Sequence, residues 1–287
     1  MDINTNVPLQ KFACRAIALD LDGTLTNHDK EVTPLTRKAI LKAQKSGVKI
    51  ILASGRPTYG ILPVAKCLNL KEHDGYILSY NGGKIVSCKT HKELFSQHIP
   101  EDMLPIIYTY AKEKGYALLG YSGQEIITES PDDEYVQEES RINKMPIKKV
   151  YNLLQNIPQR PTKLLMTGSP KLMITAEKEI QELLGNKMNA FRSSPFFIEL
   201  VPRNIDKSQS LIKLLGLLGI SPKEMMAFGD GYNDISMLKL AGMGIAMANA
   251  APEVRAEADY VTLSNEEDGI AYAIEKFLQL YKTNTPD

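Results

Sequence analysis

Two acidic segments stand near opposite ends of the chain, and each directly follows a short apolar run. The first, residues 20–24, has the sequence DLDGT, and the second, residues 229–234, has the sequence GDGYND. Either segment alone is compatible with an ordinary acidic turn. Ligands of open α/β sheets bind outside the carboxyl ends of the strands, so two such segments can meet at one edge of a sheet. Their placement makes them the strongest candidates for a functional site.

The carboxylates of Asp20 and Asp22 indicate what the chemistry would be. Two carboxylates at one strand end repel each other, so the pair needs a cation or a shared proton. Mg²⁺ suits this need because it prefers carboxylate oxygens and keeps water positions that a phosphate can take. A carboxylate can also attack phosphorus and form an aspartyl-phosphate. The first segment therefore favours a magnesium-dependent phosphoryl reaction.

Ser54 and Lys207 are two further candidates for binding a phosphate. Ser54 follows an apolar strand pattern, so its hydroxyl and the neighbouring backbone N–H can bind a phosphate oxygen, although serine before glycine is also common in turns. Lys207 falls at the first position of a helix that Asp206 caps, where the helix dipole disfavours a cation. An anion bound at this helix start would relieve the conflict.

The elements that must position these residues alternate between short apolar runs and helical periods, which is the pattern of a parallel βαβ sheet. The N-terminal part predicts strands at 16–19, 48–53 and 76–79 and helices at 34–46 and 58–68. The C-terminal part predicts helices at 207–218, 235–240 and 270–280 and strands at 225–228, 244–247 and 260–263. Both ends of the chain are therefore expected to build one α/β unit.

The middle of the chain has a different texture and reads as an insertion. Strand-like runs at 125–128, 163–167 and 196–200 mix there with helical patterns at 105–114 and 176–184. Its limits, residues 81–83 and 201–204, carry the Gly, Pro and Asn residues that are typical of chain crossings. We therefore expect a catalytic core of residues 1–82 and 201–287 and an inserted α/β domain, 83–200, that closes over the site and selects the substrate.

Composition excludes several classes of partner. The chain has 287 residues with 34 Lys plus Arg and 34 Asp plus Glu, so no overall charge attracts nucleic acid or an anionic membrane. No apolar run approaches the roughly 20 residues of a membrane span, and the N-terminus lacks the apolar core of a signal peptide. The three cysteines form no CxxC pair. A cytoplasmic protein that binds neither nucleic acid nor membranes is expected; its oligomeric state is not predicted.

The four candidate elements, in this order and at these strand and helix ends, resemble the motifs of the haloacid dehalogenase-like phosphatases, in particular their Cof-type branch. Residues 20–24 match the first motif, Ser54 the second, Lys207 the third and residues 229–234 the fourth. One departure is that Ser208 follows the lysine where the family often has glycine. The resemblance spans the whole chain and implies a doubly wound, Rossmann-like core with an inserted α/β cap.

The resemblance also implies a role for each residue. Asp20 would attack phosphorus, and Asp22 would protonate the leaving oxygen and then deprotonate water. Mg²⁺ would be held by the carboxylates of Asp20 and Asp230 and by the backbone carbonyl of Asp22, with Asp234 orienting metal-bound waters or Lys207. The phosphoryl group or the substrate would be bound by Leu21, Ser54, Gly55, Lys207 and Asn233.

The resemblance implies that the substrate is a small phosphorylated metabolite, most commonly a sugar phosphate. A phosphomutase is an alternative, because it uses the same pair of aspartates. A binding module that has the fold but no turnover is another, since fold alone does not establish activity. Asp22 favours an enzyme, because a binding module needs no acid–base group beside the metal ligand Asp20.

Overall fold

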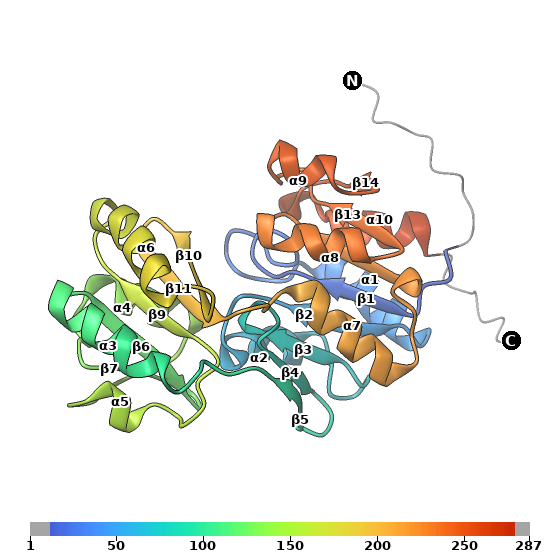
Figure 1. Ribbon diagram of the computed structural model, residues 1–287. Helices are drawn as coiled ribbons and strands as arrows, with labels where there is room; N and C mark the ends of the chain where they lie inside the picture. Colours follow the sequence, from blue (N-terminus) through green and yellow to red (C-terminus); the bar gives the residue numbers. More distant parts are fainter. Residues whose placement is uncertain (1–11, 279–287) are drawn as a thin grey trace, which may run out of the picture. The chain divides into compact units, whose positions relative to one another are not determined.

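The computed structural model describes residues 12–278, which fold into two compact units. The core unit contains residues 12–54, Leu62–Leu94 and 206–278, and the inserted unit contains Gly55–Ile61 and Phe95–Ile205. In Figure 1 the blue and teal N-terminal elements, up to β5, and the orange and red C-terminal elements build the core unit, while the green and yellow elements from α3 to β11 build the inserted unit. The fold is therefore an α/β core with an inserted α/β unit, which confirms the predicted fold class.

An eight-stranded sheet forms the centre of the core unit, with the strand order β14-β13-β12-β1-β2-β3-β4-β5. The six strands from β14 to β3 are parallel, and β4 pairs antiparallel with β3. The four residues of β1 have no exposed surface, as expected for a strand covered on both faces. The strands are β1 (Ala16–Leu19), β2 (Lys49–Ala53), β3 (Tyr76–Ser79), β4 (Lys84–Ser87), β5 (Glu93–Ser96), β12 (Met225–Gly229), β13 (Met243–Ala246) and β14 (Tyr260–Val261).

The chain adds strands to the sheet in opposite directions on the two sides of β1. The chain passes from β1 to β2 and β3 on one side and from β12 to β13 and β14 on the other, while β1 and β12 are neighbours. Because parallel crossovers are right-handed, the connecting helices of the two halves cover opposite faces of the sheet. The carboxyl ends of β1 and β12 therefore form the topological switch point, where ligands of such sheets bind.

The helices of the core unit begin and end at the residues that cap them. The Thr33 hydroxyl accepts a hydrogen bond from the Thr36 N–H at the start of α1, and the Asp206 carboxylate accepts from the N–H groups of Ser208 and Gln209 at the start of α7. Gly219 ends α7 in the left-handed conformation. The helices are α1 (Pro34–Lys45), α2 (Thr58–Cys67), α7 (Lys207–Leu218), α8 (Ile235–Leu240), α9 (Pro252–Ala256) and α10 (Gly269–Phe277); α2 begins in the inserted unit.

The inserted unit is built on a six-stranded sheet with the order β10-β11-β9-β6-β7-β8, in which most neighbours are antiparallel. An apolar core that includes Ile107, Leu164, Met173 and Ile198 packs helices α3 and α6 on this sheet. The strands are β6 (Ala117–Ser122), β7 (Glu125–Thr128), β8 (Ile147–Lys149), β9 (Leu164–Thr167), β10 (Met188–Ser194) and β11 (Phe197–Pro202). The helices are α3 (Met103–Lys114), α4 (Glu134–Asn143), α5 (Leu153–Asn156) and α6 (Pro170–Leu184).

The structure adds elements that the sequence analysis missed. Strands β4 and β5 join the edge of the core sheet, whereas the sequence analysis assigned the chain after residue 82 to the insertion. Helix α6 begins at Pro170 rather than near residue 176. The last two residues of the helix predicted at 270–280 lie outside the described residues. As limits of independently folding domains, residues 83 and 200 remain a prediction.

None of the helices in the described residues has the length and apolar character needed to cross a membrane.

Candidate active site

Three carboxylates converge at the switch point between β1 and β12. The parallel register pairs Leu19 with Phe228, and the Asp20 N–H donates to the Phe228 carbonyl at 3.0 Å. The loops that follow both strands are thereby brought to one edge of the sheet. Carboxylate oxygens of Asp20, Asp230 and Asp234 all lie within 4.8 Å of one another. The two acidic segments of the sequence therefore meet, as their placement after the strands predicts.

Lys207 lies inside this group of carboxylates. Its Nζ donates to Asp20 Oδ1 and to Asp234 Oδ1, both at 2.6 Å, and its side chain has no exposed surface. Burial opposes the charge on the ammonium, but the carboxylates of Asp20 and Asp234 outweigh this effect and raise the pKa of Lys207. The lysine is therefore a charged donor held at the start of α7.

One ammonium does not neutralise three carboxylates. Burial, together with the nearby Asp234 carboxylate, raises the pKa of Asp20 to about 8, although Lys207 opposes the shift. Burial also raises the pKa of Asp230, against the effect of the Thr24 hydroxyl, which donates to Asp230 Oδ1 at 2.6 Å. A divalent cation would favour the ionised carboxylates and so offset both the cost of their burial and their mutual repulsion. An all-oxygen set of ligands fits Mg²⁺.

Asp234 connects the lysine to the loop that carries Asp230. One oxygen of Asp234 accepts from Lys207, and the other accepts from the backbone N–H groups of Asp230 at 3.1 Å and Gly231 at 2.9 Å. The carboxylate is 1% exposed. Asp234 thus contacts Lys207 and lies within the carboxylate cluster itself, while its role in orienting Lys207 stays a prediction.

Gly23 shapes the other side of the Asp230 carboxylate. Its φ is +81°, and a Cβ at this position would lie 2.3 Å from Asp230 Oδ2. Only glycine therefore lets the first loop pass so close to Asp230 while adopting a left-handed backbone. Glycine is therefore needed in the DLDGT segment because Asp230, which is far away in the sequence, lies next to it in the fold.

Replacing Gly23 with Ala is expected to displace Asp230 and to lower kcat/KM by up to about 10²-fold, the scale of a misplacement near 1 Å. Gly47→Ala is the matched control, because Gly47 has φ +88° but has no atom within 4 Å of an added Cβ. Both variants should lose about 1–2 kcal/mol of stability to the left-handed backbone. Equal activity of the two variants would contradict the proposed contact with Asp230.

Ser54 and Asn233 lie at the same edge of the core sheet. Ser54 directly follows β2, in which Leu52 pairs with Leu19 of β1. Ser54 is 2% exposed. The Ser54 N–H donates to the Leu78 carbonyl at 2.9 Å. The Asn233 side-chain amide donates to Asn81 Oδ1 at 3.0 Å, and Asn81 has a left-handed backbone with φ +55°.

Gly55 belongs to the inserted unit, although it directly follows Ser54. Its carbonyl accepts a hydrogen bond from Lys163 Nζ at 3.3 Å, and Lys163 in turn pairs with Glu199 at 3.0 Å. Both of these charged side chains are buried. The backbone after Ser54 is therefore held by residues that the sequence analysis did not identify, and no local sequence pattern marks them.

Asp22 differs from the other aspartates because its carboxylate is not part of the converging cluster. Asp22 Oδ1 accepts a hydrogen bond from Lys30 Nζ at 2.8 Å, and both side chains are partly exposed. Lys30, like Lys163 and Glu199, is a residue that the sequence analysis missed. The contact depends on the turn between the two residues, which no motif describes.

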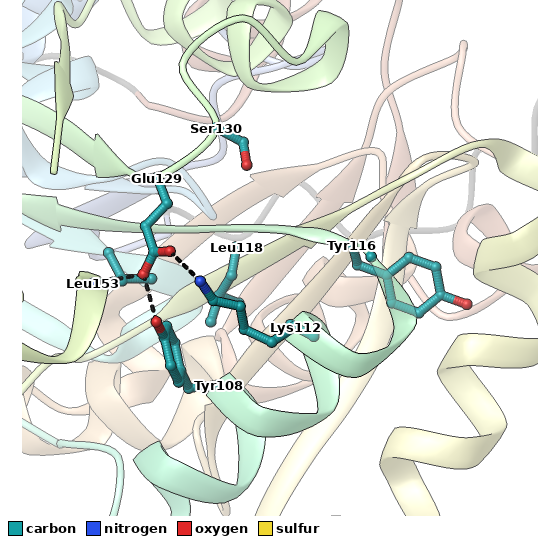
Figure 2. Close-up of a pocket in the computed structure, with 9 residues that line it drawn as sticks. Tyr108, Lys112, Tyr116, Leu118, Glu129, Ser130 and Leu153 are labelled. Atoms are coloured by element: carbon teal, nitrogen blue, oxygen red, sulfur yellow. Dashed lines mark hydrogen bonds and ion pairs between the residues drawn. The ribbon is translucent and has the colours of Figure 1, made fainter. Parts of the chain in front are cut away.

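A separate hollow lies within the inserted unit and has a volume of about 280 Å³. Figure 2 shows Glu129 at its wall, with Tyr108 and Lys112 pointing at the carboxylate. Glu129 accepts from the Tyr108 hydroxyl at 2.7 Å and from the Lys112 ammonium and the Leu153 N–H, both at 2.8 Å. These polar groups satisfy one another. The cluster around Asp20 is therefore the better candidate for catalysis.

Comparison with known proteins gives consistent results. A family model described as haloacid dehalogenase-like hydrolase matches residues 17–274. The Bacillus subtilis protein YxeH, whose name assigns it an inferred phosphatase activity, is 32% identical over 92% of this chain and 98% of its own length.

Two solved structures share the fold over almost their whole length. A haloacid dehalogenase-like hydrolase from Bacteroides thetaiotaomicron has a TM-score of 0.90 and 45% identity and covers 92% of this chain and 99% of its own. The subclass IIB sugar phosphatase BT4131 has a TM-score of 0.76 and 26% identity and covers 92% of this chain and 98% of its own.

Proposed function

The chain belongs to the haloacid dehalogenase-like hydrolases, in their Cof-type branch, and is a phosphatase; from this premise we propose that it hydrolyses small phosphorylated metabolites with Mg²⁺ through an aspartyl-phosphate on Asp20. The observation that carries the proposal is the buried Asp20 carboxylate, which lies 2.6 Å from the Lys207 ammonium and within a cluster of three carboxylates. A nucleophile, a cation for phosphoryl oxygens and an oxygen-rich metal site are thereby combined.

The carboxylates of Asp20 and Asp230 and the backbone carbonyl of Asp22 would hold the magnesium ion. Bound there, the ion supplies positive charge to the phosphoryl oxygens during transfer. The fit rests on the donor set, which consists of hard oxygen ligands, and on the raised pKa values of Asp20 and Asp230.

The protein residues would perform two successive displacements. In the first, an Asp20 oxygen forms a bond to phosphorus while the bond to the leaving oxygen breaks, and Asp22 gives its proton to that oxygen. In the second, Asp22 takes a proton from water, the water oxygen bonds to phosphorus, and the bond to Asp20 breaks. Phosphate leaves and both aspartates return to their starting states.

The phosphoryl oxygens would be held by the Lys207 ammonium, the Ser54 hydroxyl and the backbone of Leu21 and Gly55. Asn233 would contact the phosphate or the substrate.

We propose that the substrates are sugar phosphates and that the protein is located in the cytoplasm. The structural similarity to a protein named as a sugar phosphatase supports the substrate class. Residues 83–200 would select among sugar phosphates, because most of the core residues described above would act on the phosphoryl group that all these substrates share.

The function is tested by incubating the purified protein with sugar phosphates, nucleotides, pyridoxal phosphate and polyol phosphates and measuring inorganic phosphate. Release is expected, with the highest kcat/KM for a sugar phosphate. Conversion to a second sugar phosphate without net release would identify a mutase. Binding of these compounds without turnover would identify a silent binding module, and either result would overturn the proposal.

Removal of the metal with EDTA is expected to stop phosphate release, and added Mg²⁺ is expected to restore it. Ca²⁺ should bind without supporting normal turnover, because its larger and more variable shell lets Asp20 chelate through both oxygens and lose the lone pair that attacks phosphorus. Steady-state rates in the chelator and with each ion check this. Full activity in EDTA, or equal activity with Ca²⁺, is incompatible with the proposed metal role.

A further inference from the structure

The ion pair between Lys30 and Asp22 belongs to a turn whose backbone is unusual. Lys30 Nζ lies 2.8 Å from Asp22 Oδ1, and Lys30 has a left-handed backbone with φ +62°. Such a conformation is unfavourable for a residue other than glycine. An exposed ion pair adds little stability in return. The stability of the fold therefore gives no reason for a lysine at this position.

The turn that presents Lys30 is fixed from within. The Asn27 N–H donates to the Glu31 carbonyl at 3.0 Å, and the Glu31 N–H donates to Asn27 Oδ1 at 2.9 Å. The Lys30 N–H donates to the Asn27 carbonyl at 3.0 Å. Asp22 itself forms an isolated β-bridge with Thr26. Both partners of the ion pair are thus held by hydrogen bonds of the same short segment.

The same segment is also tied to the C-terminal part of the core unit. The Asn265 side-chain amide donates to the Thr26 carbonyl at 3.0 Å, and the His28 N–H donates to Glu266 Oε1 at 2.8 Å. The Asn249 side-chain amide donates to the Gly23 carbonyl at 2.8 Å. Lys30 is therefore an exposed lysine on a loop whose backbone is anchored.

The other ammonium of the site is already engaged. Lys207 donates to Asp20 and Asp234, so it is committed to the nucleophile and the metal-site loop. The Asp22 carboxylate is not one of the three that converge, and its Oδ1 accepts from Lys30 at 2.8 Å. Lys207 therefore contacts Asp20 and Asp234, whereas Lys30 contacts Asp22.

We propose that Lys30 is a positioning residue for Asp22, holding one carboxylate oxygen so that the other is directed toward the leaving oxygen of the substrate. This inference rests on the proposed function, in which Asp22 is the acid and base. It predicts that loss of Lys30 impairs proton transfer to the leaving group while substrate binding is largely kept.

The test compares two substrates that differ in their need for a proton. The alkoxide leaving group of a sugar phosphate needs one, whereas the phenolate of p-nitrophenyl phosphate is stable without one. The variants are Lys30→Met, Lys30→Arg and Asp22→Asn, with Lys38→Met as the control because Lys38 is an exposed lysine of α1. The value of kcat/KM is measured for each, since it covers the steps up to the phosphoenzyme.

Lys30→Met is expected to lower kcat/KM for the sugar phosphate by at least about tenfold, short of the roughly 10²–10⁴-fold loss expected for Asp22→Asn. Its effect on p-nitrophenyl phosphate should be less than about threefold, and the KM for the sugar phosphate should change little. Lys30→Arg should recover most of the activity, and Lys38→Met should match the wild type. Lys30→Gly, which accepts the left-handed backbone, replaces Lys30→Met if that variant does not fold.

The outcomes separate this inference from the proposed function. If Asp22→Asn discriminates between the two substrates but Lys30→Met does not, Lys30 has no positioning role and the proposed function stands. Equal losses on both substrates in Lys30→Met would also overturn the inference. If Asp22→Asn itself fails to discriminate, Asp22 is not the general acid, and the role of Lys30 falls with it.

Discussion

Replacing Asp20 with Asn is expected to lower phosphate release by on the order of 10⁴-fold or more, the scale of losing a covalent nucleophile. The amide cannot attack phosphorus, and it is a poor ligand for magnesium. The variant should stay folded, because Asn has the shape of Asp and Lys207 keeps its bond to Asp234 at 2.6 Å.

The measurement is kcat with the best substrate, together with circular dichroism and intact mass after rapid acid quenching. The wild type should show a phosphorylated species that the variant lacks. Asp74→Asn is a suitable control, because this partly exposed aspartate of the core unit pairs with lysines away from the site. Appreciable turnover by a folded Asp20→Asn protein would exclude the covalent mechanism.

The same variant has a predictable effect on stability in the absence of metal. Burial raises the pKa of Asp20 from 3.8 to about 8, so the folded protein binds a proton that the unfolded chain releases between these values. The contribution of Asp20 to the free energy of unfolding of the wild type should therefore fall as pH rises from about 4 to 8. Asn does not titrate. In EDTA, the unfolding free energy of Asp20→Asn minus that of the wild type should therefore increase as the pH rises across this window. Urea unfolding at several pH values checks the sign, and an opposite trend would contradict the raised pKa.

Replacing Lys207 with Met is expected to damage both stability and activity. Lys207 has no exposed side-chain surface, and its loss leaves the buried carboxylates of Asp20 and Asp234 without their cation. Removing one partner of a buried ion pair costs about 3–5 kcal/mol. The loss of a charged donor to the phosphoryl group should lower kcat by about 10²–10³-fold as well.

Denaturant unfolding and kcat measure the two effects separately. Lys213→Met is the matched control, since Lys213 lies on the same helix α7 and is exposed. Its stability should change by no more than about 1 kcal/mol. A Lys207→Met protein with unchanged stability would show that the carboxylates do not depend on this ammonium.

The sequence allowed accurate prediction where the signal is local. The four apolar residues of β1 and the caps Thr33 and Asp206 set element bounds through contacts that reach only a few residues. Asp20 and Asp230 were recognised because each directly follows a strand, and Lys207 because it begins the helix that Asp206 caps. Their meeting could be anticipated from the rule that parallel strands end at one edge.

Other features had no local signal. Strands β4 and β5 are short strands of mixed polarity at one end of the core sheet, and their place in it depends on β3, with which β4 pairs. The grouping of Gly55–Ile61 with the inserted unit, where Lys163 donates to Gly55, has no motif at either end.

The type of fold, the family and the candidate residues for a phosphoryl reaction could be recognised from the sequence alone. The contacts among these groups became visible only in the folded protein: Lys207 joins Asp20 across 187 residues, Gly23 leaves room for Asp230, and Lys30 pairs with Asp22. The difference arises from the distance along the sequence over which each kind of interaction acts. Strand periodicity and helix caps act over a few residues, whereas ion pairs and close packing depend on which loops the sheet order brings together.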